Sequence, residues 1–312
     1  MPLTEDLKNI FGRQFKDRVS FDEPMSRHTS FKVGGPAQVF ARPRSMEEAV
    51  SLIQFSRSES LPLLVVGDGT NLIVRDGGIQ GMVLSLSGMA QDIRWDEQDD
   101  ETIRVHAHAG IKTKDLCKQA WKKGYAGLNF ALGIPGTLGG NIAMNAGTQM
   151  GAMDQVLLNL GVLNGSGRMK TIGRSDLHFS YRHLGWPQGM DEPVILSATL
   201  CLSKGDPEAL AQEARRILKA RTKNQPVSLP NAGCIFKNPE NHEPAGKLID
   251  MAGLKGFSMG GARISEKHAN FIVNENKARA TDILALVKKI KDTVFARWGV
   301  DLETEVTIVG KD

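Results

Sequence analysis

The segment NAGCIFKNP, residues 231–239, contains a cysteine whose chemistry has two interpretations. A turn-like Asn-Ala-Gly leads into Cys234, and a short apolar run follows it. Either the S–H proton of Cys234 takes part in a reaction, or the side chain fills a core position, as buried cysteines commonly do. If the run is a strand, its alternation puts Cys234 and Phe236 on one face and Ile235 on the other.

Two carboxylates near the C-terminus are a second candidate for chemistry. In a strand over LETEVTIVG, residues 302–310, Glu303 and Glu305 lie on one face. Two carboxylates about 6.5 Å apart raise each other's pKa. A solvated strand edge is the alternative, and the alternation does not choose between the two glutamates.

A glycine-rich stretch, GIPGTLGGNIAMNAG at residues 133–147, predicts a loop where the backbone approaches a ligand. Small side chains let backbone N–H groups reach a phosphate, often at a helix N-terminus. The spacing is neither that of the dinucleotide-binding G-x-G-x-x-G nor that of a P-loop, and a tight structural turn is the alternative. The candidate ligand-binding residues of this stretch are Gly133, Pro135, Gly136, Thr137, Gly139, Gly140, Asn141, Ala143 and Gly147.

A second glycine-rich turn, GDGTN at residues 67–71, follows a predicted buried strand. Its two glycines, hydroxyl and amide suit an anion-binding nest. Such turns between strands are common, so this one is weak evidence by itself, but two glycine-rich loops in one domain favour a bound diphosphate. The candidate residues are Gly67, Asp68, Gly69, Thr70 and Asn71.

The composition is that of an ordinary globular protein of 312 residues, 41% hydrophobic and 24% charged. The length favours two or three domains. A formal net charge of +4 without a dense Lys/Arg run suits anionic small molecules and does not indicate a nucleic-acid partner. No stretch approaches the roughly 18 apolar residues that span a bilayer. Three widely spaced cysteines predict free thiols in a reducing cytoplasm and no zinc site.

The predicted elements define an α+β fold class with a domain boundary near residue 205. Strands dominate the first two-thirds, with apolar runs at 61–66, 82–86 and 194–203 and a hairpin that turns at Asn164-Gly165. A capping box at Ser45–Glu48 opens a helix there. Helices are more frequent after the boundary. They are expected from Pro207 to about Arg221, from Pro244 to Gly253, and from a Thr281 cap to Trp298.

Taken together, seven stretches resemble one family and occur in its order. They are TSFKVGGPA (29–37), GDGTNLIV (67–74), GIPGTLGGNIAMNAG (133–147), SYR (180–182), NAGCIFKNP (231–239), SEKHANFIVN (265–274) and LETEVTIVG (302–310). The sequence is similar over nearly its whole length to the UDP-N-acetylenolpyruvoylglucosamine reductases, also called UDP-N-acetylmuramate dehydrogenases. The resemblance implies a two-lobed FAD-binding domain of PCMH type and a C-terminal α+β substrate-binding domain. We place the N-terminal helical extension at 1–20, the lobes at 21–90 and 91–205, and the substrate domain at 206–312.

The resemblance also implies a cytoplasmic flavoenzyme of peptidoglycan precursor synthesis. Such an enzyme binds FAD non-covalently and uses NADPH as the reductant. It reduces the enolpyruvyl ether of a UDP-sugar to give UDP-N-acetylmuramate. Because both substrates use one pocket in turn, no separate nicotinamide-binding fold is expected. Nor are a metal, a nucleic acid, membrane insertion or an obligate protein partner.

Three catalytic residues follow from the resemblance. Arg182 neutralises the charge of an enolate next to a substrate carboxylate, although its own stretch equally suits an exposed arginine stacked on Tyr181. Cys234 donates the proton, in a position where most relatives carry serine. Glu305 matches the family's catalytic glutamate, with an expected rise in its pKa that Arg182 opposes.

The residues expected to contact the substrate are Tyr181, Lys223, Lys237 and Asn238. The stretch that follows Arg182 contains no tyrosine, so the sequence resembles the family branch without a tyrosine-bearing lid insertion. His268, in SEKHANF, is expected to be a packed and hydrogen-bonded histidine.

Two other functions are compatible with parts of the sequence. An oxidase or dehydrogenase of another small substrate shares the FAD-binding domain, but the NAGCIFKNP and LETEV stretches lie in a C-terminal part that such oxidases replace. A nucleotide-binding regulatory protein without a redox role is the third possibility, and the colour of the purified protein separates it from the flavoenzymes.

Overall fold

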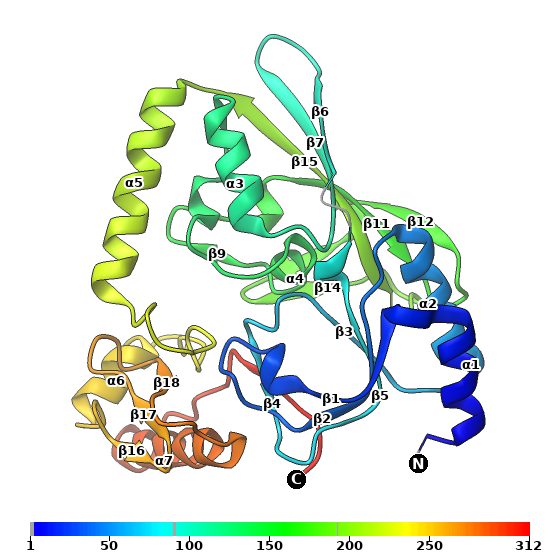
Figure 1. The fold of residues 1–312 in the computed structure, drawn as a ribbon. Helices are drawn as coiled ribbons and strands as arrows, with labels where there is room; N and C mark the ends of the chain where they lie inside the picture. Colours follow the sequence, from blue (N-terminus) through cyan, green and yellow to red (C-terminus); the bar gives the residue numbers. More distant parts are fainter. Residues whose placement is uncertain (1–2, 90–91, 192) are drawn as a thin grey trace. The chain divides into compact units, whose positions relative to one another are not determined.

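The computed structural model describes residues 3–89, 92–191 and 193–312, which divide into two compact units (Figure 1). Unit 1 comprises Met1–Ser20, Phe40–Asp68 and Gly81–Lys219, and unit 2 comprises Phe21–Val39, Gly69–Gln80 and Ala220–Asp312. The chain therefore passes between the units several times, whereas the domains expected from the sequence are consecutive. Those domain limits stay a prediction, and the expected lobe boundary at 90/91 lies outside the described residues.

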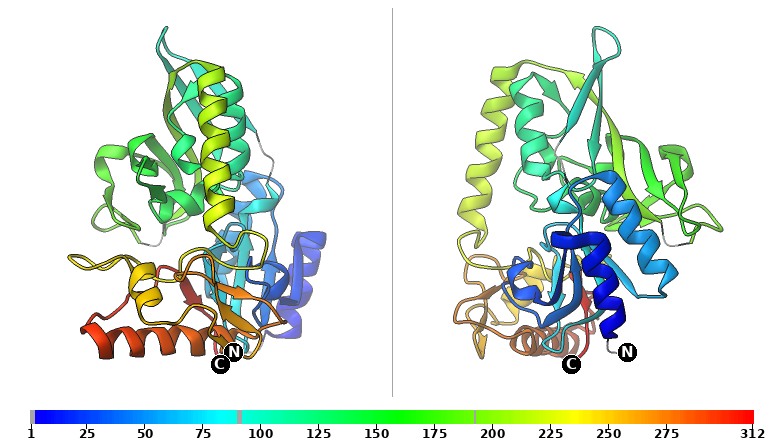
Figure 2. Two further views of the ribbon diagram at one scale, coloured as in Figure 1. Left: turned by 90° about the vertical axis from the view of Figure 1, so that its left-hand side faces the viewer. Right: turned by 45° about the vertical axis from the view of Figure 1, so that its right-hand side comes forward.

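An antiparallel sheet supports unit 1. Its longest strand, β15 (Val194–Lys204), lies between β11 (Leu157–Leu163) and β7 (Thr102–His108). The edge strands of the sheet are β12 (Met169–Gly173) and β6 (Ile93–Glu97). The short β8 (Tyr125–Ala126) pairs with the end of β15. The β11–β12 pairing confirms the predicted hairpin, and the β6–β7 hairpin projects from the sheet in both views of Figure 2.

Two helices of unit 1 begin where the sequence signals predict. α2 (Met46–Ser58) starts at the Ser45 hydroxyl, which accepts the Glu48 N–H at 3.2 Å. α5 (Pro207–Asn224) starts at the Asp206 carboxylate, which accepts the N–H groups of the first turn. It continues three residues past the predicted end and into unit 2. α1 (Glu5–Phe15), α3 (Thr113–Lys122) and the short α4 (Leu138–Ala143) complete the set.

A second sheet of four strands has the order β1-β2-β5-β3. These strands are β1 (Val19–Pro24), β2 (Pro36–Ala41), β5 (Ile79–Ser85) and β3 (Leu63–Val66). β3 and β5 are parallel. The remaining pairs of unit 1 are β9 (Gly147–Thr148) with β10 (Gly151–Ala152), and β13 (His178–Ser180) with β14 (His183–Gly185).

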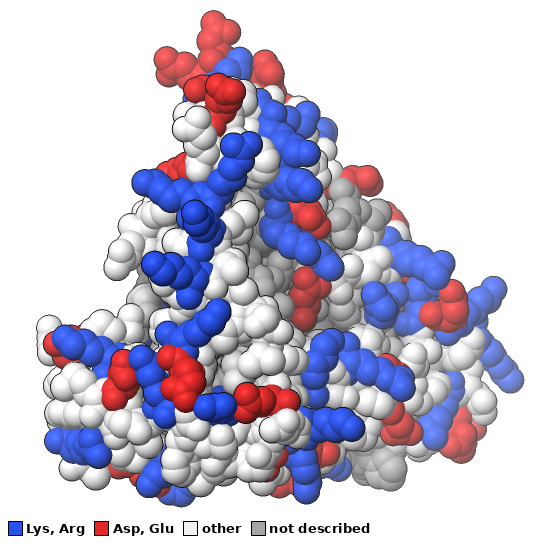
Figure 3. Space-filling view, turned by 60° about the vertical axis from the view of Figure 1, so that its left-hand side comes forward, with Lys and Arg blue, Asp and Glu red and all other residues white. Residues whose placement is uncertain are grey.

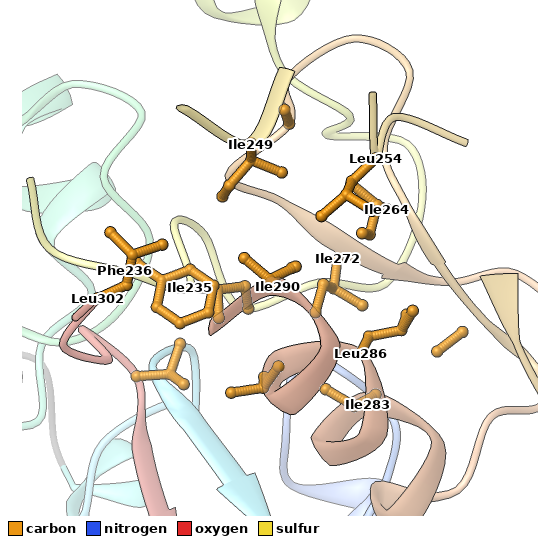
Figure 4. Packing of buried hydrophobic residues seen from close by; sticks show 14 of the residues in the cluster. Ile235, Phe236, Ile249, Leu254, Ile264, Ile272, Ile283, Leu286, Ile290 and Leu302 are labelled. Atoms are coloured by element: carbon orange, nitrogen blue, oxygen red, sulfur yellow. The ribbon is translucent and has the colours of Figure 1, made fainter. Parts of the chain in front are cut away.

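Unit 2 packs two helices and a small sheet around an apolar core. The sheet is β16 (Ser258–Met259), β17 (Ala262–Ile264) and β18 (Ile272–Asn274), and the helices are α6 (Ala245–Met251) and α7 (Ala280–Trp298). Figure 4 shows Ile283, Leu286 and Ile290 of α7 gathered with Ile235 and Phe236 from the cysteine segment. Burying such side chains contributes roughly 1.5–3 kcal/mol each, so the core that stabilises unit 2 also holds the residues after Cys234.

The C-terminal segment is less regular than predicted. Within residues 302–310, only β19 (Thr307–Val309) is a strand, and it pairs in parallel with β4 (Leu72–Val74). The stretch before it bends because the N–H groups of both Glu305 and Val306 point at the Ile235 carbonyl.

In the ranges that the structure describes, no helix is long and apolar enough to cross a membrane.

The N-terminus of α7 depends on a carboxylate from a distant segment, which the sequence did not indicate. Thr281 is not the cap, because the helix already begins at Ala280. Instead, Asp76 accepts the N–H groups of Ala280 and Thr281 at 3.0 Å each, together with the Thr281 hydroxyl. Burial raises the pKa of Asp76, but these hydrogen bonds and the Arg279 guanidinium outweigh it and hold the pKa below its ordinary value.

Replacing Asp76 with alanine should therefore destabilise the protein by about 1–2 kcal/mol at pH 7, the usual cost of losing a helix cap. Because the folded pKa is depressed, the stabilisation is complete above the unfolded pKa of about 3.9 and disappears as the pH falls through the folded value. Urea unfolding of both proteins between pH 7 and pH 3 measures this convergence. Asp292→Ala, an exposed carboxylate on the same helix, is the control. A difference independent of pH would contradict the role of the Asp76 charge.

Candidate active site

Cys234 lies in irregular backbone of unit 2 that is held on both sides. Before it, Gly233 has a φ of 78°, a conformation that favours glycine, and its N–H donates to Asn231 Oδ1 at 2.9 Å. After it, the Ile235 N–H donates to the Asn270 carbonyl at 2.8 Å. Cys234 itself is half-buried. The segment is therefore fixed in place, and Cys234 is less buried than the residues that follow it.

Asn270 replaces the strand partner that the sequence predicts for this segment. Its buried side chain accepts the Phe236 N–H at 3.0 Å and donates to the Phe236 carbonyl at 2.8 Å. The predicted strand and its faces are therefore wrong: Ile235 and Phe236 are both buried, and Cys234 is not in their core cluster. Sequence reasoning missed Asn270, although SEKHANF, which contains it, was among the family stretches.

The second carboxylate segment lies against the cysteine segment. Phe236 pairs with Thr304, and the Glu305 N–H donates to the Ile235 carbonyl at 2.7 Å. Asn71 then holds Glu305 from another direction, since its Nδ2 donates to the Glu305 carbonyl at 3.1 Å. Unit 2 thus brings together two predicted catalytic residues, Cys234 and Glu305, from segments about 70 residues apart.

The two glutamates that the alternation left equal are different in the structure. Glu303 is exposed and forms an ion pair with Lys237, with 2.5 Å between Oε1 and Nζ. Glu305 is half-buried. Glu303 is thus already engaged by a lysine at the surface, whereas Glu305 lies against the Cys234 segment. The geometry supports Glu305.

Arg221 is a further residue near Cys234 that the sequence did not single out. It is half-buried at the end of α5. Burial lowers the pKa of its guanidinium, and the Cys234 sulfur opposes this by favouring the charged form. By the same interaction, Arg221 favours the thiolate of Cys234 over the thiol. In the sequence, Arg221 looks like the polar residues 222–224 that follow it, which are exposed. Its partial burial is visible only in the structure.

The other predicted residues of unit 2 differ in their surroundings. Asn238 caps α6, because its Oδ1 accepts the Ala245 N–H at 3.1 Å. Lys223 is exposed. His268 is packed as predicted: its Nδ1 accepts the Asn270 N–H at 3.3 Å, its ring lies 4.9 Å from that of Phe271, and burial lowers its pKa.

Arg182 belongs to unit 1, in the two-residue turn between β13 and β14. Ser180 pairs with His183, so Tyr181 and Arg182 form the turn. The Arg182 guanidinium lies 4.9 Å from the centre of the exposed Tyr181 ring, which is the stacking that the simpler interpretation predicts. However, Arg182 has a φ of 58°. This left-handed conformation is uncommon for a non-glycine residue, and here the tight turn imposes it.

The glycine-rich stretch of unit 1 has an inner and an outer side. A Cβ on Gly139 would lie 2.7 Å from Ala109 Cβ, and one on Gly147 would lie 2.6 Å from Ala152 Cβ, so these glycines permit close packing. On the outer side, Gly140 and Ala143 are exposed and share a face of α4. A Cβ on Gly140 would meet only Thr137 Oγ1, at 3.5 Å.

This outer face fits a flat ligand such as FAD, because no bulky side chain keeps the ligand from the backbone. The α4 N-terminus has fewer N–H groups available for a phosphate than the sequence suggests. The N–H groups of Leu138 and Gly139 already donate to the carbonyls of Ile111 and Ala109 at 2.8 Å each. Phosphate-binding donors must therefore come from other residues, and the individual FAD contacts stay predictions.

The GDGTN turn links the two units at Asp68–Gly69. Gly67 must be glycine because a Cβ there would lie 2.2 Å from Thr137 Oγ1, which joins this turn to the glycine-rich stretch within unit 1. Gly69 has a φ of 61°, and a Cβ there would lie 2.1 Å from the His28 carbonyl oxygen. Close packing therefore explains why both positions are glycine, in addition to the predicted anion binding.

Cations dispersed in the sequence gather on one face of unit 1. Figure 3 shows Lys and Arg side chains over α3 and α5. The exposed cations of α3, of its C-cap and of the part of α5 that belongs to unit 1 are Lys114, Lys118, Lys122, Lys123, Arg215, Arg216 and Lys219. The face adjoins the glycine-rich stretch, because Lys112 pairs with Thr137. A positive field next to a ligand-binding loop suits anionic small molecules.

Comparison with known proteins defines first a class and then a family. Residues 37–173 match the model of an FAD binding domain, which together with the open face of α4 defines an FAD-dependent oxidoreductase. Residues 225–309 match the model of the UDP-N-acetylenolpyruvoylglucosamine reductase C-terminal domain. The chain belongs to the UDP-N-acetylenolpyruvoylglucosamine reductase family. The predicted α+β fold, FAD as the cofactor and NADPH as its reductant are thereby confirmed.

Relatives cover nearly the whole chain. A UDP-N-acetylenolpyruvoylglucosamine reductase of Syntrophus aciditrophicus is 46% identical over 94% of this chain and 93% of its own. One of Geotalea uraniireducens is 41% identical over 99% and 100%, respectively. The crystal structure of the Thermus caldophilus enzyme matches with a TM-score of 0.76 and 32% identity, over 93% of this chain and 97% of that one. The C-terminal match disfavours an oxidase of another substrate.

Proposed function

We propose that this protein reduces UDP-N-acetylglucosamine enolpyruvate to UDP-N-acetylmuramate with electrons from NADPH, as a cytoplasmic step of peptidoglycan precursor synthesis. The observation that carries the proposal is the pairing of the Cys234 and Glu305 segments within unit 2. Family membership supports the reaction, and this pairing supports Cys234 and Glu305 as two of its catalytic residues. The exposed basic face of unit 1 supports an anionic nucleotide substrate.

The exposed face of α4 at Gly140 and Ala143 would help to hold FAD, which would supply the hydride that the terminal alkene carbon of the substrate requires. Negative charge then develops on the carbon that bears the carboxylate and is delocalised as an enolate. The planar guanidinium of Arg182 neutralises this charge, because its fork of N–H donors matches a carboxylate. Glu305 assists when it carries a proton, since a protonated carboxyl donates a hydrogen bond to an enolate oxygen.

Cys234 donates the proton that completes the reduction, so one hydride and one proton saturate the double bond. Its thiol, with a reference pKa of about 8.5, is a far stronger acid than a serine hydroxyl would be in the same position. The Arg221 guanidinium stabilises the thiolate that remains. We assign substrate contacts to Tyr181, Lys223, Lys237 and the free amide N–H groups of Asn238.

The proposal is tested by mixing protein reduced anaerobically with NADPH against UDP-N-acetylglucosamine enolpyruvate. The oxidised flavin absorption should return in stoichiometric amount, with UDP-N-acetylmuramate as the product. UDP-N-acetylglucosamine, which lacks the alkene, is the control and should leave the flavin reduced. Reduction by NADPH without reoxidation by the enolpyruvyl compound would indicate another substrate, and colourless protein that takes up no FAD would indicate a non-redox role.

A further inference from the structure

The Tyr181-Arg182 turn has an anchor that the proposed reaction does not use directly. Asn145 follows α4 at the end of the glycine-rich stretch and is buried. Its Nδ2 donates to the Ser180 carbonyl at 3.2 Å, and Ser180 is the residue immediately before the turn. Its Oδ1 accepts the Asp154 N–H at 3.1 Å. One amide side chain thus ties the Arg182 hairpin to two separate segments of unit 1.

The backbone at Asn145 is itself unusual. Its φ is 40°, in the left-handed region where asparagine is tolerated better than most residues. The Asn145 N–H donates to Ile142, and the neighbouring Ala146 N–H donates to Asn141 at 2.7 Å. The end of α4 therefore reverses sharply at this position, and the reversal directs the amide at the hairpin.

A second contact holds the other end of the same hairpin. Arg174 donates from Nη1 to the Leu177 carbonyl at 3.2 Å, and its guanidinium lies 4.6 Å from the centre of the Phe179 ring. Arg174 also pairs with the Asp154 carboxylate, at 3.3 Å from Nη2 to Oδ2. Asp154 thus connects both anchors, one through its backbone N–H and the other through its side chain.

We propose that Asn145 is a positioning residue that acts through Arg182. A two-residue turn with a left-handed arginine stores strain, and the surrounding structure must hold it. The bond to the Ser180 carbonyl fixes the residue that precedes the turn, so it restricts the direction in which the guanidinium projects. The inference deepens the proposed function and rests on the role assigned there to Arg182.

Asn145→Asp isolates this contact. Aspartate has the same shape, tolerates a positive φ and keeps the acceptor for the Asp154 N–H. It loses the donor to Ser180 and adds a negative charge against that carbonyl, so Asn145→Gly, which removes the amide without adding charge, is measured beside it. The matched control is Ser56→Ala, which removes another buried hydrogen bond to a carbonyl, from Ser56 Oγ to Leu61 at 2.9 Å.

The first measurement is equilibrium binding by calorimetry, with two ligands that differ in the carboxylate. Asn145→Asp should weaken binding of UDP-N-acetylmuramate about tenfold, because this ligand, unlike UDP-N-acetylglucosamine, has the carboxylate that Arg182 is proposed to bind. Binding of UDP-N-acetylglucosamine should change less than about twofold, because its contacts do not depend on Arg182. Ser56→Ala should leave both affinities unchanged. An equal loss for both ligands would overturn the inference.

The second measurement is a double-mutant cycle on the two half-reactions. Asn145→Asp should slow reoxidation by the enolpyruvyl substrate about tenfold or more and leave reduction by NADPH nearly unchanged, since positioning errors act on the step that the group serves. If Asn145 acts through Arg182, adding Asn145→Asp to Arg182→Ala should cause little further loss. Fully additive effects would overturn the inference.

The remaining outcomes are also distinguishable. If wild-type protein is not reoxidised by the substrate, the proposed function fails. If wild type turns over but Asn145→Asp matches it in both measurements, only the role of Asn145 fails. Should Asn145→Asp not fold, Asn145→Gly removes the amide without strain at the positive φ, and its binding of the two ligands decides the same question.

Discussion

Cys234→Ala should slow reoxidation of the reduced protein by UDP-N-acetylglucosamine enolpyruvate about 10²- to 10⁴-fold, the usual contribution of a positioned general acid. Reduction of the flavin by NADPH should change less than about twofold, because that half-reaction does not use the proton of Cys234. The structure makes this separation sharp. Cys234 is half-buried, whereas the residues after it are buried in the core of unit 2, so alanine removes the proton donor with little effect on packing.

Stopped-flow absorbance under anaerobic conditions measures the two half-reactions separately. Cys234→Ser should retain substantial reoxidation, because a hydroxyl in the same place still carries a transferable proton. Cys201→Ala is the matched control, since Cys201 is also a half-buried free thiol but lies in β15 of unit 1. Reoxidation by Cys234→Ala at the wild-type rate would remove the thiol from the mechanism.

Glu305→Ala should have the second largest effect, a loss of about 10²- to 10³-fold in reoxidation, comparable to the removal of one donor that stabilises a developing oxyanion. Reduction by NADPH should again be nearly unchanged. Glu305→Gln separates hydrogen bonding from proton exchange, because the amide mimics the protonated carboxyl as a donor. We expect it to recover part of the loss.

The comparison with Glu303 makes this prediction specific. Glu303→Ala removes an exposed carboxylate and its ion pair with Lys237, a kind of contact that contributes about 0–1 kcal/mol. It should change reoxidation less than about threefold. If Glu303→Ala were the damaging variant and Glu305→Ala the harmless one, our choice between the two carboxylates would be wrong.

Local signals determined much of the fold before any tertiary contact was known. The Ser45 capping box, the Asp206-Pro207 start of α5 and the Asn164-Gly165 turn all lie where predicted, because each depends on hydrogen bonds within a few residues. The glycine-rich stretch was also recognised as a place where backbone is left uncovered. The seven family stretches gave the reaction class, which comparison with relatives confirmed.

Local signals failed where a side chain from a distant segment replaces a regular backbone partner. Asn270 takes the place of a strand beside Phe236, and Asp76 takes the place of a cap on α7. In both cases the residue type is ordinary in its own stretch, and the partner is 34 or more residues away. Alternation and capping rules describe neighbours in sequence, so they do not predict these contacts.

The catalytic assignment shows the same division. Sequence alone supplied a cysteine, an arginine and two equivalent glutamates, and the resemblance to a family chose among them. The tertiary structure adds a physical difference between Glu303, paired with Lys237 at the surface, and Glu305, held by Asn71 and the Ile235 carbonyl. The acidity of a carboxyl group depends on the charges and hydrogen bonds within a few ångströms of it, and these are fixed by folding.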